Sequence, residues 1–221
     1  MRTEALEKLV NKPVKDTYGR YVGFVVGFSV DPSGELKSVG VDQGNGEFTE
    51  YPSQRIVSTA DGFVVIPAWK VDFEKLGKET DGVRRRTKAL QDLARDGEVP
   101  RPLFEEMMGK YNEDTAKIKE TYGALAESMA VRIGELEEQK EILNRFLVNV
   151  KVQYRAGEID EGAYKVASEY CQAMQKRNTQ EQDELSKMLK STTEPVNSPT
   201  TSTQKVVAQP PVQTVAQPTS G

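Results

Sequence analysis

A long row of regularly spaced apolar residues constrains this chain more than any other feature. From Phe104 to Tyr154 these positions alternate in steps of four and three, with two consecutive four-residue steps around Met129. That spacing is a heptad seam with a single stutter, so it predicts one continuous helix with a narrow apolar ridge. At ~1.5 Å per residue the helix is roughly 80 Å long. A ridge of that length must be covered by flanking helices, by another chain, or by both.

We therefore predict that this seam mediates self-association. The residues predicted to carry the contact are Ile118, Tyr122, Leu125, Met129, Ile133, Leu136, Leu143, Leu147, Val150 and Tyr154. Polar residues also occupy seam positions, some of them in the helix that follows. For Thr115 and Asn178 the sequence leaves two alternatives: the side chain is buried and sets the register of the coil, or it contacts water. For Lys140 and Glu181 we expect contact with water, because a buried unpaired charge is costly.

Two short segments interrupt the helical pattern in the same way. Arg95–Val99 and Arg155–Ile159 share an Arg-x-Gly-Glu-aliphatic pattern at a spacing of 60 residues. Each glycine suits the left-handed end of a helix, and Asp160 suits the N-terminal cap of the next. The sequence predicts helices at about 72–96, 100–156 and 160–190, with breaks near 97–102 and 157–160. A kink within one longer rod is the alternative at the first break, which the Gly-Pro combination there disfavours.

Composition excludes several classes of site. With no His and one Cys, a zinc site, a His-based acid–base pair and a Ser-His-Asp triad are excluded, so we expect no enzyme and no cofactor. A lone cysteine, Cys171, suits a reducing cytoplasm, and we expect it to be a small buried apolar residue. No apolar run approaches the ~20 residues that span a bilayer. The overall apolar fraction of 37% suggests an elongated rather than a compact molecule.

The first seventy residues show the short strands and close turns of a small β-barrel. Strict alternation from Tyr21 to Val30 places Phe24, Val26 and Phe28 on one face of a strand. Further strands are expected at Leu36–Asp42, Glu47–Tyr51, Ile56–Val57 and Phe63–Ile66. The predicted fold class is α+β. Its predicted parts are a nearly closed β-barrel at 1–70, a helical coiled-coil region at 71–190 and a disordered tail at 191–221.

Within this β region, the stretch from Lys12 to Ile66 resembles the PRC-barrel family. The matching residues are Val14-Lys15-Asp16-x-Tyr18-Gly19-Arg20-x-Val22-Gly23-x-Val25, the turn Asp31-x-x-Gly34 and the closing hairpin Ile56–Ile66. Modules of this family are usually interaction or scaffold units, so the resemblance implies binding rather than catalysis. We accordingly expect Asp16 to shape the turn after the first strand and not to act as a catalytic acid.

A block of cations occurs early in the helical region. Arg84, Arg85, Arg86 and Lys88 lie within five residues and are predicted to bind nucleic-acid phosphate or an anionic membrane surface. The alternative is a solvated helix face whose cations pair with acids one turn away, at Asp81 and Asp92. The net charge of −4 opposes DNA binding by the molecule as a whole, although a local patch can still bind.

The tail is nearly uncharged, with 11 Ser or Thr and 5 Pro among its 31 residues, and is predicted to be disordered. Val207–Pro210 recurs as Val215–Pro218. β-branched residues beside prolines favour an extended peptide that can add as a strand to a partner's sheet. A chance repeat is equally open. The residues predicted to bind a partner are Lys205, Val206, Val207, Pro210, Pro211, Val212 and Val215.

The combination of barrel, charged coil with two breaks, and Pro/Val-bearing tail resembles the CdvA family of archaeal cell-division proteins. Its specific residues are the junction Ile66-Pro67-x-Trp69-Lys70 and the motif from Tyr154 through Ala156-Gly157-Glu158-Ile159 to Tyr164. The resemblance implies a non-enzymatic cytoplasmic filament at mid-cell that is linked to DNA and membrane. It also implies recruitment of an ESCRT-III homologue by a C-terminal peptide, best matched here by Lys205–Val212. The alternative function is a nucleoid or RNA-processing module that binds nucleic acid through the barrel and Arg84–Lys88.

Overall fold

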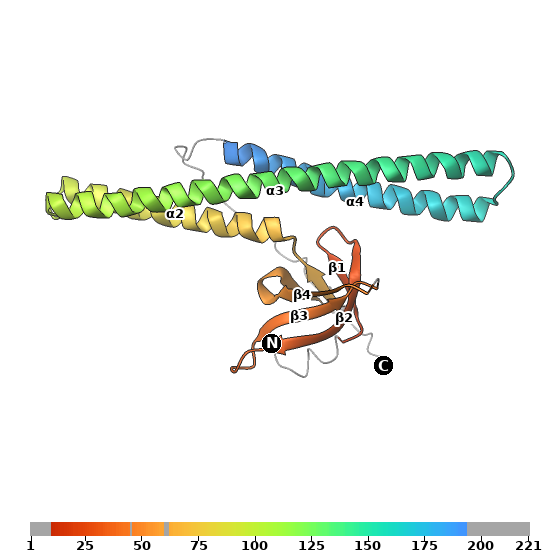
Figure 1. Cartoon of the computed structure of the whole chain (residues 1–221), viewed down its shortest axis with the longest axis horizontal. Helices are drawn as coiled ribbons and strands as arrows, with labels where there is room; N and C mark the ends of the chain where they lie inside the picture. Colours follow the sequence, from red (N-terminus) through yellow and green to blue (C-terminus); the bar gives the residue numbers. More distant parts are fainter. Residues whose placement is uncertain (1–9, 45, 60–61, 194–221) are drawn as a thin grey trace, which may run out of the picture.

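The structure, a computed structural model, describes residues 10–44, 46–59 and 62–193. Its helices are α2 (Ala68–Arg95), α3 (Arg101–Arg155) and α4 (Glu161–Thr193). Figure 1 shows α3 running along the whole helical part, with α2 beside one half and α4 beside the other. A small β-sheet lies against the middle of this rod, where α2 begins. The molecule is therefore elongated, as its composition predicts.

Six strands form one sheet that curves into a half-barrel. Their order is β4-β3-β2-β1-β6-β5, so β4 and β5 are its edges. β1 and β6 run parallel, and the other neighbours pair antiparallel. The strands are β1 (Pro13–Asp16), β2 (Tyr21–Val30), β3 (Leu36–Asp42), β4 (Phe48–Pro52), β5 (Ile56–Thr59) and β6 (Gly62–Val65), with a 3-10 turn η1 (Ser53–Arg55) between β4 and β5. The α+β fold class is confirmed.

The half-barrel encloses an apolar core made mostly of valines. At Gly23 in β2 the sheet leaves no room for a side chain, since an added Cβ would lie 2.2 Å from the carbonyl oxygen of Asp42 in β3. Glycine at this position therefore permits the close approach of two strands. The buried core residues are Val14, Val25, Val39, Val41, Tyr51, Phe63 and Val65.

The predicted uninterrupted alternation of β2 is wrong beyond Val25. The register between β2 and β3 shifts between Val25 and Gly27, which marks a β-bulge. The extra residue reverses the faces, so Phe28 packs against the core while Phe24 and Val26 stay 49% and 54% exposed. A bulge of this kind inserts one unpaired residue and turns later side chains to the opposite face. The apolar residues of β2 are consequently divided between the core and the outer surface.

Both predicted breaks are helix ends of the same type. Gly97 and Gly157 each have φ of +76°, and the amide of the glutamate that follows each glycine donates to the carbonyl five residues earlier at 3.0 Å. These bonds satisfy carbonyl groups that the helix itself leaves unpaired. Asp160 caps α4 as expected, its Oδ1 accepting from the Ala163 amide at 2.7 Å. The chain therefore forms two antiparallel hairpins, and the alternative of a single kinked rod is wrong.

The flanking helices cover the seam of α3 within one chain. At the crossing where all three helices meet, the buried cluster comprises Trp69, Leu76, Leu125, Met129, Leu136 and Leu185. At the edge of this cluster, Phe73 of α2 meets Tyr122 of α3 edge-to-face at 6.0 Å. Near the tip of the second hairpin, Tyr154 stacks on Tyr164 at 4.7 Å. The greatest apolar burial in the rod is therefore at its middle, beside the half-barrel.

We predict that Leu136→Ala destabilises the fold by about 2–5 kcal/mol, because Leu136 is 1% exposed and its truncation leaves a cavity between helices. Chemical unfolding followed by circular dichroism measures the change. Val131→Ala is the matched control on the same helix, since Val131 is 64% exposed and its loss should change stability by less than ~0.5 kcal/mol. Equal losses in the two variants would contradict the assignment of this core.

Candidate functional site

The middle of the rod holds a buried ionic cluster around Glu181 of α4, which is 1% exposed. Glu181 Oε2 accepts hydrogen bonds from Arg20, which follows β1, and from Arg132 Nη2 of α3 at 3.1 Å. Glu181 Oε1 accepts from Arg132 Nε at 3.1 Å and from Trp69 Nε1 of α2 at 3.4 Å. The expectation that Glu181 reaches water is therefore wrong. Two guanidinium groups neutralise the carboxylate, which makes its burial tolerable.

The turn between β1 and β2 delivers Arg20 to this cluster. Asp16 Oδ1 accepts from the backbone amides of Tyr18 and Arg20, each at 2.9 Å, and its Oδ2 accepts from Arg20 Nε at 2.5 Å. Arg20 Nη1 then donates to Asn178 Oδ1 at 3.1 Å. Asp16 thus shapes the turn, as expected, and Asn178 is buried as a partner of the half-barrel rather than left in water.

A second carboxylate, Glu184, joins the half-barrel to the start of α2. It accepts from the Tyr18 hydroxyl at 2.6 Å and from Lys70 Nζ at 2.5 Å. Burial, followed by the hydrogen bond to Glu184, raises the pKa of Tyr18, so its hydroxyl stays protonated and donates. Together, the bonds to Glu181 and Glu184 fix the half-barrel against all three helices. We name these residues the junction cluster: Asp16, Tyr18, Arg20, Lys70, Arg132, Asn178, Glu181 and Glu184.

The junction cluster is built for attachment rather than for acid–base chemistry. Burial alone would raise the pKa of Glu181, but the hydrogen bonds from Arg132 and Arg20 outweigh it and hold this pKa below its usual value. A carboxylate saturated by two guanidinium groups is a poor proton acceptor. Among the described residues, no group of three or more Cys, Asp or Glu is placed to hold a metal ion. Nor does a helix of the described chain have the length and apolarity to cross a bilayer.

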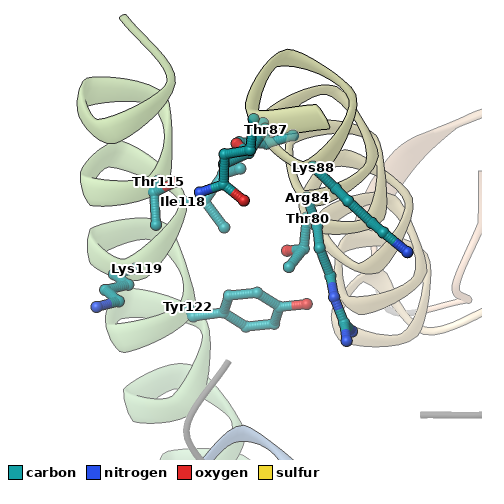
Figure 2. Close-up of a pocket in the computed structure, with 10 residues that line it drawn as sticks. Thr80, Arg84, Thr87, Lys88, Thr115, Ile118, Lys119 and Tyr122 are labelled. Carbon is teal, nitrogen blue, oxygen red and sulfur yellow. The ribbon is translucent and has the colours of Figure 1, made fainter. Parts of the chain in front are cut away.

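A groove between α2 and α3 collects part of the predicted cationic block (Figure 2). It has a volume of about 350 Å³ and is lined by Thr80, Val83, Arg84, Thr87, Lys88 and Gln91 from α2 and by Thr115, Ile118, Lys119 and Tyr122 from α3. The Tyr122 ring reaches from α3 toward Thr80 and Arg84, while Lys88 and Lys119 extend outward from the groove. Among the described residues that line it, three are cations and none is an acid.

The structure thus separates the four predicted anion-binding residues. Arg84 and Lys88 line the groove, whereas Arg85 and Arg86 are exposed but do not line it. Lys119 joins them from α3, across the hairpin, so no pattern local to α2 predicts it. Of the acids predicted to pair with the block, Asp92 binds Arg95 instead, at 3.2 Å. Thr115, for which the sequence allows both burial and contact with water, is half-buried. Its hydroxyl donates to the carbonyl of Tyr111 on the same helix at 2.7 Å.

The predicted self-association residues lie at the contacts of α3 with α2 and α4. Leu125, Met129, Leu136 and Val150 are buried. The remaining members are half-buried: Ile118, Tyr122, Ile133, Leu143, Leu147 and Tyr154. Lys140 is half-buried and donates to Gln182 Oε1 at 3.1 Å, and Cys171 is fully buried, as expected. Contact between chains through this seam stays a prediction.

The predicted partner-binding residues of the tail lie outside the described residues. This applies to all of Lys205, Val206, Val207, Pro210, Pro211, Val212 and Val215. The described chain ends with α4 at Thr193, so helix α4 extends three residues into the segment assigned to the tail from sequence.

Comparison with known proteins identifies the family. A model of the CdvA-like coiled-coil domain matches residues 68–214, about two thirds of the chain. The chain belongs to the CdvA family. The CdvA match begins at the first residue of α2 and includes both hairpins, the groove and the helical half of the junction cluster.

A CdvA relative extends the similarity beyond the helices. Cell division protein A of Sulfolobus acidocaldarius is 28% identical over 186 residues, which cover 84% of this chain and 78% of that protein. Only 154 residues follow Pro67, so the aligned region also includes part of the segment that forms the half-barrel. The similarity to this relative therefore extends from the coil into the segment that forms the half-barrel.

We predict that Glu181→Gln destabilises the fold by about 3 kcal/mol at pH 7, because it removes the buried carboxylate that the guanidinium groups of Arg20 and Arg132 share. The pKa of Glu181 is lower in the folded than in the unfolded state, so its contribution is present above the ordinary glutamate pKa of ~4.3. It is lost as the pH falls through the folded value. Unfolding free energies should be measured between about pH 3 and 8, a range that includes the ordinary glutamate pKa. The free energy of unfolding should fall less steeply at acidic pH in the variant than in the wild type.

Glu135→Gln is the matched control for this measurement. Glu135 also binds Arg132, at 2.8 Å, but it is 56% exposed. Exposed ion pairs contribute little, so this variant should lose less than ~1 kcal/mol and keep the acid limb of the wild type. If the two variants behave alike, the carboxylate of Glu181 is not the centre of the junction.

Proposed function

We propose that this protein is a non-enzymatic scaffold of cell division that polymerises at the division site. The observation that carries the proposal is the CdvA family match across all three helices, joined to the similarity with a relative named Cell division protein A. We further propose that it acts in the cytoplasm at mid-cell and recruits an ESCRT-III homologue through its C-terminal tail. The resemblance found in the sequence supports these finer points.

The structure suits a positioning role. The junction cluster fixes the half-barrel at the middle of a long rod, and α4 returns the chain to that middle before the tail begins (Figure 1). The orientation of the barrel relative to the origin of the tail is therefore set by buried ion pairs. A polymer of such units would display many tails, and multivalent display raises the effective concentration of a weakly binding peptide.

We predict that removal of residues 200–221 abolishes binding of the ESCRT-III homologue while assembly is retained. Sedimentation and negative-stain microscopy of the full chain and of the truncated chain report assembly, and a pull-down with the purified homologue reports recruitment. Val207→Ser with Val212→Ser should lose at least about tenfold in affinity, whereas the control Thr200→Ser with Thr201→Ser should bind as the full chain does. A full chain that stays monomeric at high concentration would refute the scaffold.

Nucleic-acid binding is a second candidate function, and the cationic groove between α2 and α3 favours it. Arg84 and Lys88 of α2 and Lys119 of α3 line the groove, with no acid among the described lining residues. Such a cluster attracts phosphate even on a molecule of net charge −4, because the field that a polyanion meets at close range is local. In this view the rod binds DNA on its α2–α3 half.

We predict that Arg84→Gln with Lys88→Gln weakens binding to duplex DNA by at least about tenfold and flattens its salt dependence, because phosphate contacts are lost. Arg85→Gln with Arg86→Gln removes the same charge outside the groove and is the matched control. Fluorescence anisotropy across a salt series measures both. If the two pairs weaken binding equally, general charge and not the groove is responsible.

A further inference from the structure

Coverage of the seam by α2 and α4 raises the question of which apolar surfaces remain for contact between chains. Two groups of large apolar side chains stay exposed on separate parts of the molecule. The barrel patch comprises Tyr21, Phe24, Val26 and Phe48, which are 49–63% exposed. The hairpin patch comprises Ile142, Phe146, Val166 and Tyr170, which are 51–69% exposed. Clusters of this kind usually mark interaction surfaces.

The barrel patch lies on the outer face of β2, β3 and β4. Phe24 and Phe48 are both paired with Asp42 across neighbouring strands, so all three share that face. The Tyr21 and Phe24 rings meet edge-to-face at 5.4 Å. The β-bulge in β2 creates this patch, because it leaves Phe24 and Val26 outside while Phe28 enters the core.

A shallow hollow of about 310 Å³ lies within the barrel patch, beside Val26 and Phe48. Gly27 and Gly40 face each other on β2 and β3 and line it without side chains. The Phe48 ring leans over Gly40, where an added Cβ would lie 2.8 Å from its Cε2 atom. The hollow therefore has a backbone floor and an aromatic wall, a shape that receives a protruding ring.

The hairpin patch consists of side chains that protrude from two neighbouring helices and so form a ridge. The hydrogen bond from Gln175 to Asn144 at 2.6 Å fixes the antiparallel register of α3 and α4 and places Phe146 and Tyr170 at nearly the same level. Ile142 and Phe146 are four residues apart on α3, as are Val166 and Tyr170 on α4, so each pair shares a helix face.

Both faces of this ridge lie on the same side of the hairpin. On α3, Arg132 faces the half-barrel, because it and Arg20 bind the same carboxylate of Glu181. Phe146 follows Arg132 by two heptads and therefore lies on the same face of α3. Tyr170 precedes Arg177 by one heptad, and Arg177 Nε lies 3.8 Å from the Cβ position of Gly19 in the half-barrel. Positions one or two heptads apart share a helix face. Phe146 and Tyr170 therefore project together from the second hairpin.

We propose that the hairpin patch of one molecule docks on the barrel patch of a second copy of this chain. The proposal deepens the proposed function, on which it rests, by naming the contact that builds the polymer. Shape is the first argument, because a ridge fills a glycine-floored hollow whereas two hollows facing each other leave a void. Both patches stay exposed in the folded chain, so neither covers the other within one molecule and they are free to meet between molecules.

Charge is the second argument. Residues 10–66 contain five cationic and seven acidic side chains, for a net charge of −2. Residues 142–170, which run from the hairpin patch to the hairpin tip and back, contain four cationic and four acidic side chains, for a net charge of 0. A neutral hairpin avoids the repulsion that two acidic barrels would meet, so charge favours contact of barrel with hairpin over contact of barrel with barrel.

Area is the third argument. Four large side chains of this exposure offer roughly 400 Å² of apolar surface, about half of the ~800 Å² per partner that a stable isolated complex buries. Such a contact is weak by itself and becomes effective when it is repeated. Because the two patches differ, the contact is heterologous, and successive copies extend a chain of molecules unless the rotation closes a ring.

Light scattering and sedimentation of the full chain test this contact. Phe24→Thr with Phe48→Thr, and separately Phe146→Gln with Tyr170→Gln, should raise the concentration needed for assembly about tenfold or more, since buried aromatic anchors dominate interface energies. Val57→Thr on β5 and Val148→Gln with Val152→Gln on α3 are the matched controls, exposed but outside the patches, and should assemble as the wild type does. Circular dichroism confirms that each variant folds.

Cross-linking gives a second, independent readout in a Cys171→Ala background. Chains carrying Phe48→Cys, mixed with chains carrying Phe146→Cys, should form covalent heterodimers on oxidation, and each variant alone should not. The contact would be refuted if the patch variants assembled as well as the wild type, or if each cysteine variant alone cross-linked as strongly as the mixture. Either result would leave the proposed scaffold function intact. Wild type that does not assemble at all would refute the scaffold itself.

Discussion

The carboxylate of Glu181 receives hydrogen bonds from Arg20, Arg132 and Trp69, which belong to the half-barrel, α3 and α2. Four parts of the chain therefore meet at one buried side chain of α4. Removing either guanidinium would leave buried charge unbalanced, which is far costlier than losing an exposed pair. The apolar crossing of the three helices lies beside this cluster and excludes water from it. Ionic fixation and apolar packing thus act at the same place, the middle of the rod.

This arrangement limits the surfaces that are left for the proposed assembly. A long apolar ridge on α3 would be an adhesive surface if the helix stood alone, but α2 and α4 fold back over it and use most of that surface inside the chain. What remains for contact between molecules is the outer face of the half-barrel, the end of the second hairpin and the cationic groove. The folded unit is consequently a rigid element with separate contact surfaces, which suits a scaffold better than a helix that pairs along its whole length.

Local patterns explain what the sequence predicts well. The strand Leu36–Asp42 and the helix ends at Gly97 and Gly157 agree with expectation, because alternation and left-handed glycine act over a few residues. The alternating pattern does not reveal the bulge after Val25, because a bulge depends on how the strand pairs with its neighbour in the sheet.

Contacts between distant segments account for the larger error. Glu181 was expected in water, but its partners Arg20 and Arg132 lie 161 and 49 residues away. Lys119 likewise joins the cationic groove from the opposite helix. A carboxylate at the core position of a coil requires a compensating cation. A glutamate at a seam position therefore indicates that an arginine from elsewhere in the chain lies against it, but the sequence does not say which one.

The account depends most on the claim that each hairpin forms within one chain. Replacing Asn144 and Gln175, whose side chains meet at 2.6 Å across α3 and α4, by cysteine in a Cys171→Ala background tests it directly when a short bifunctional thiol reagent joins the two cysteines, because the reagent spans the length of the side chains that are lost. Cross-linking followed by denaturing electrophoresis should give a cross-linked product with the mass of a single chain at every protein concentration. Covalent dimers as the main product would show that α3 and α4 pair between chains, and the account would be wrong.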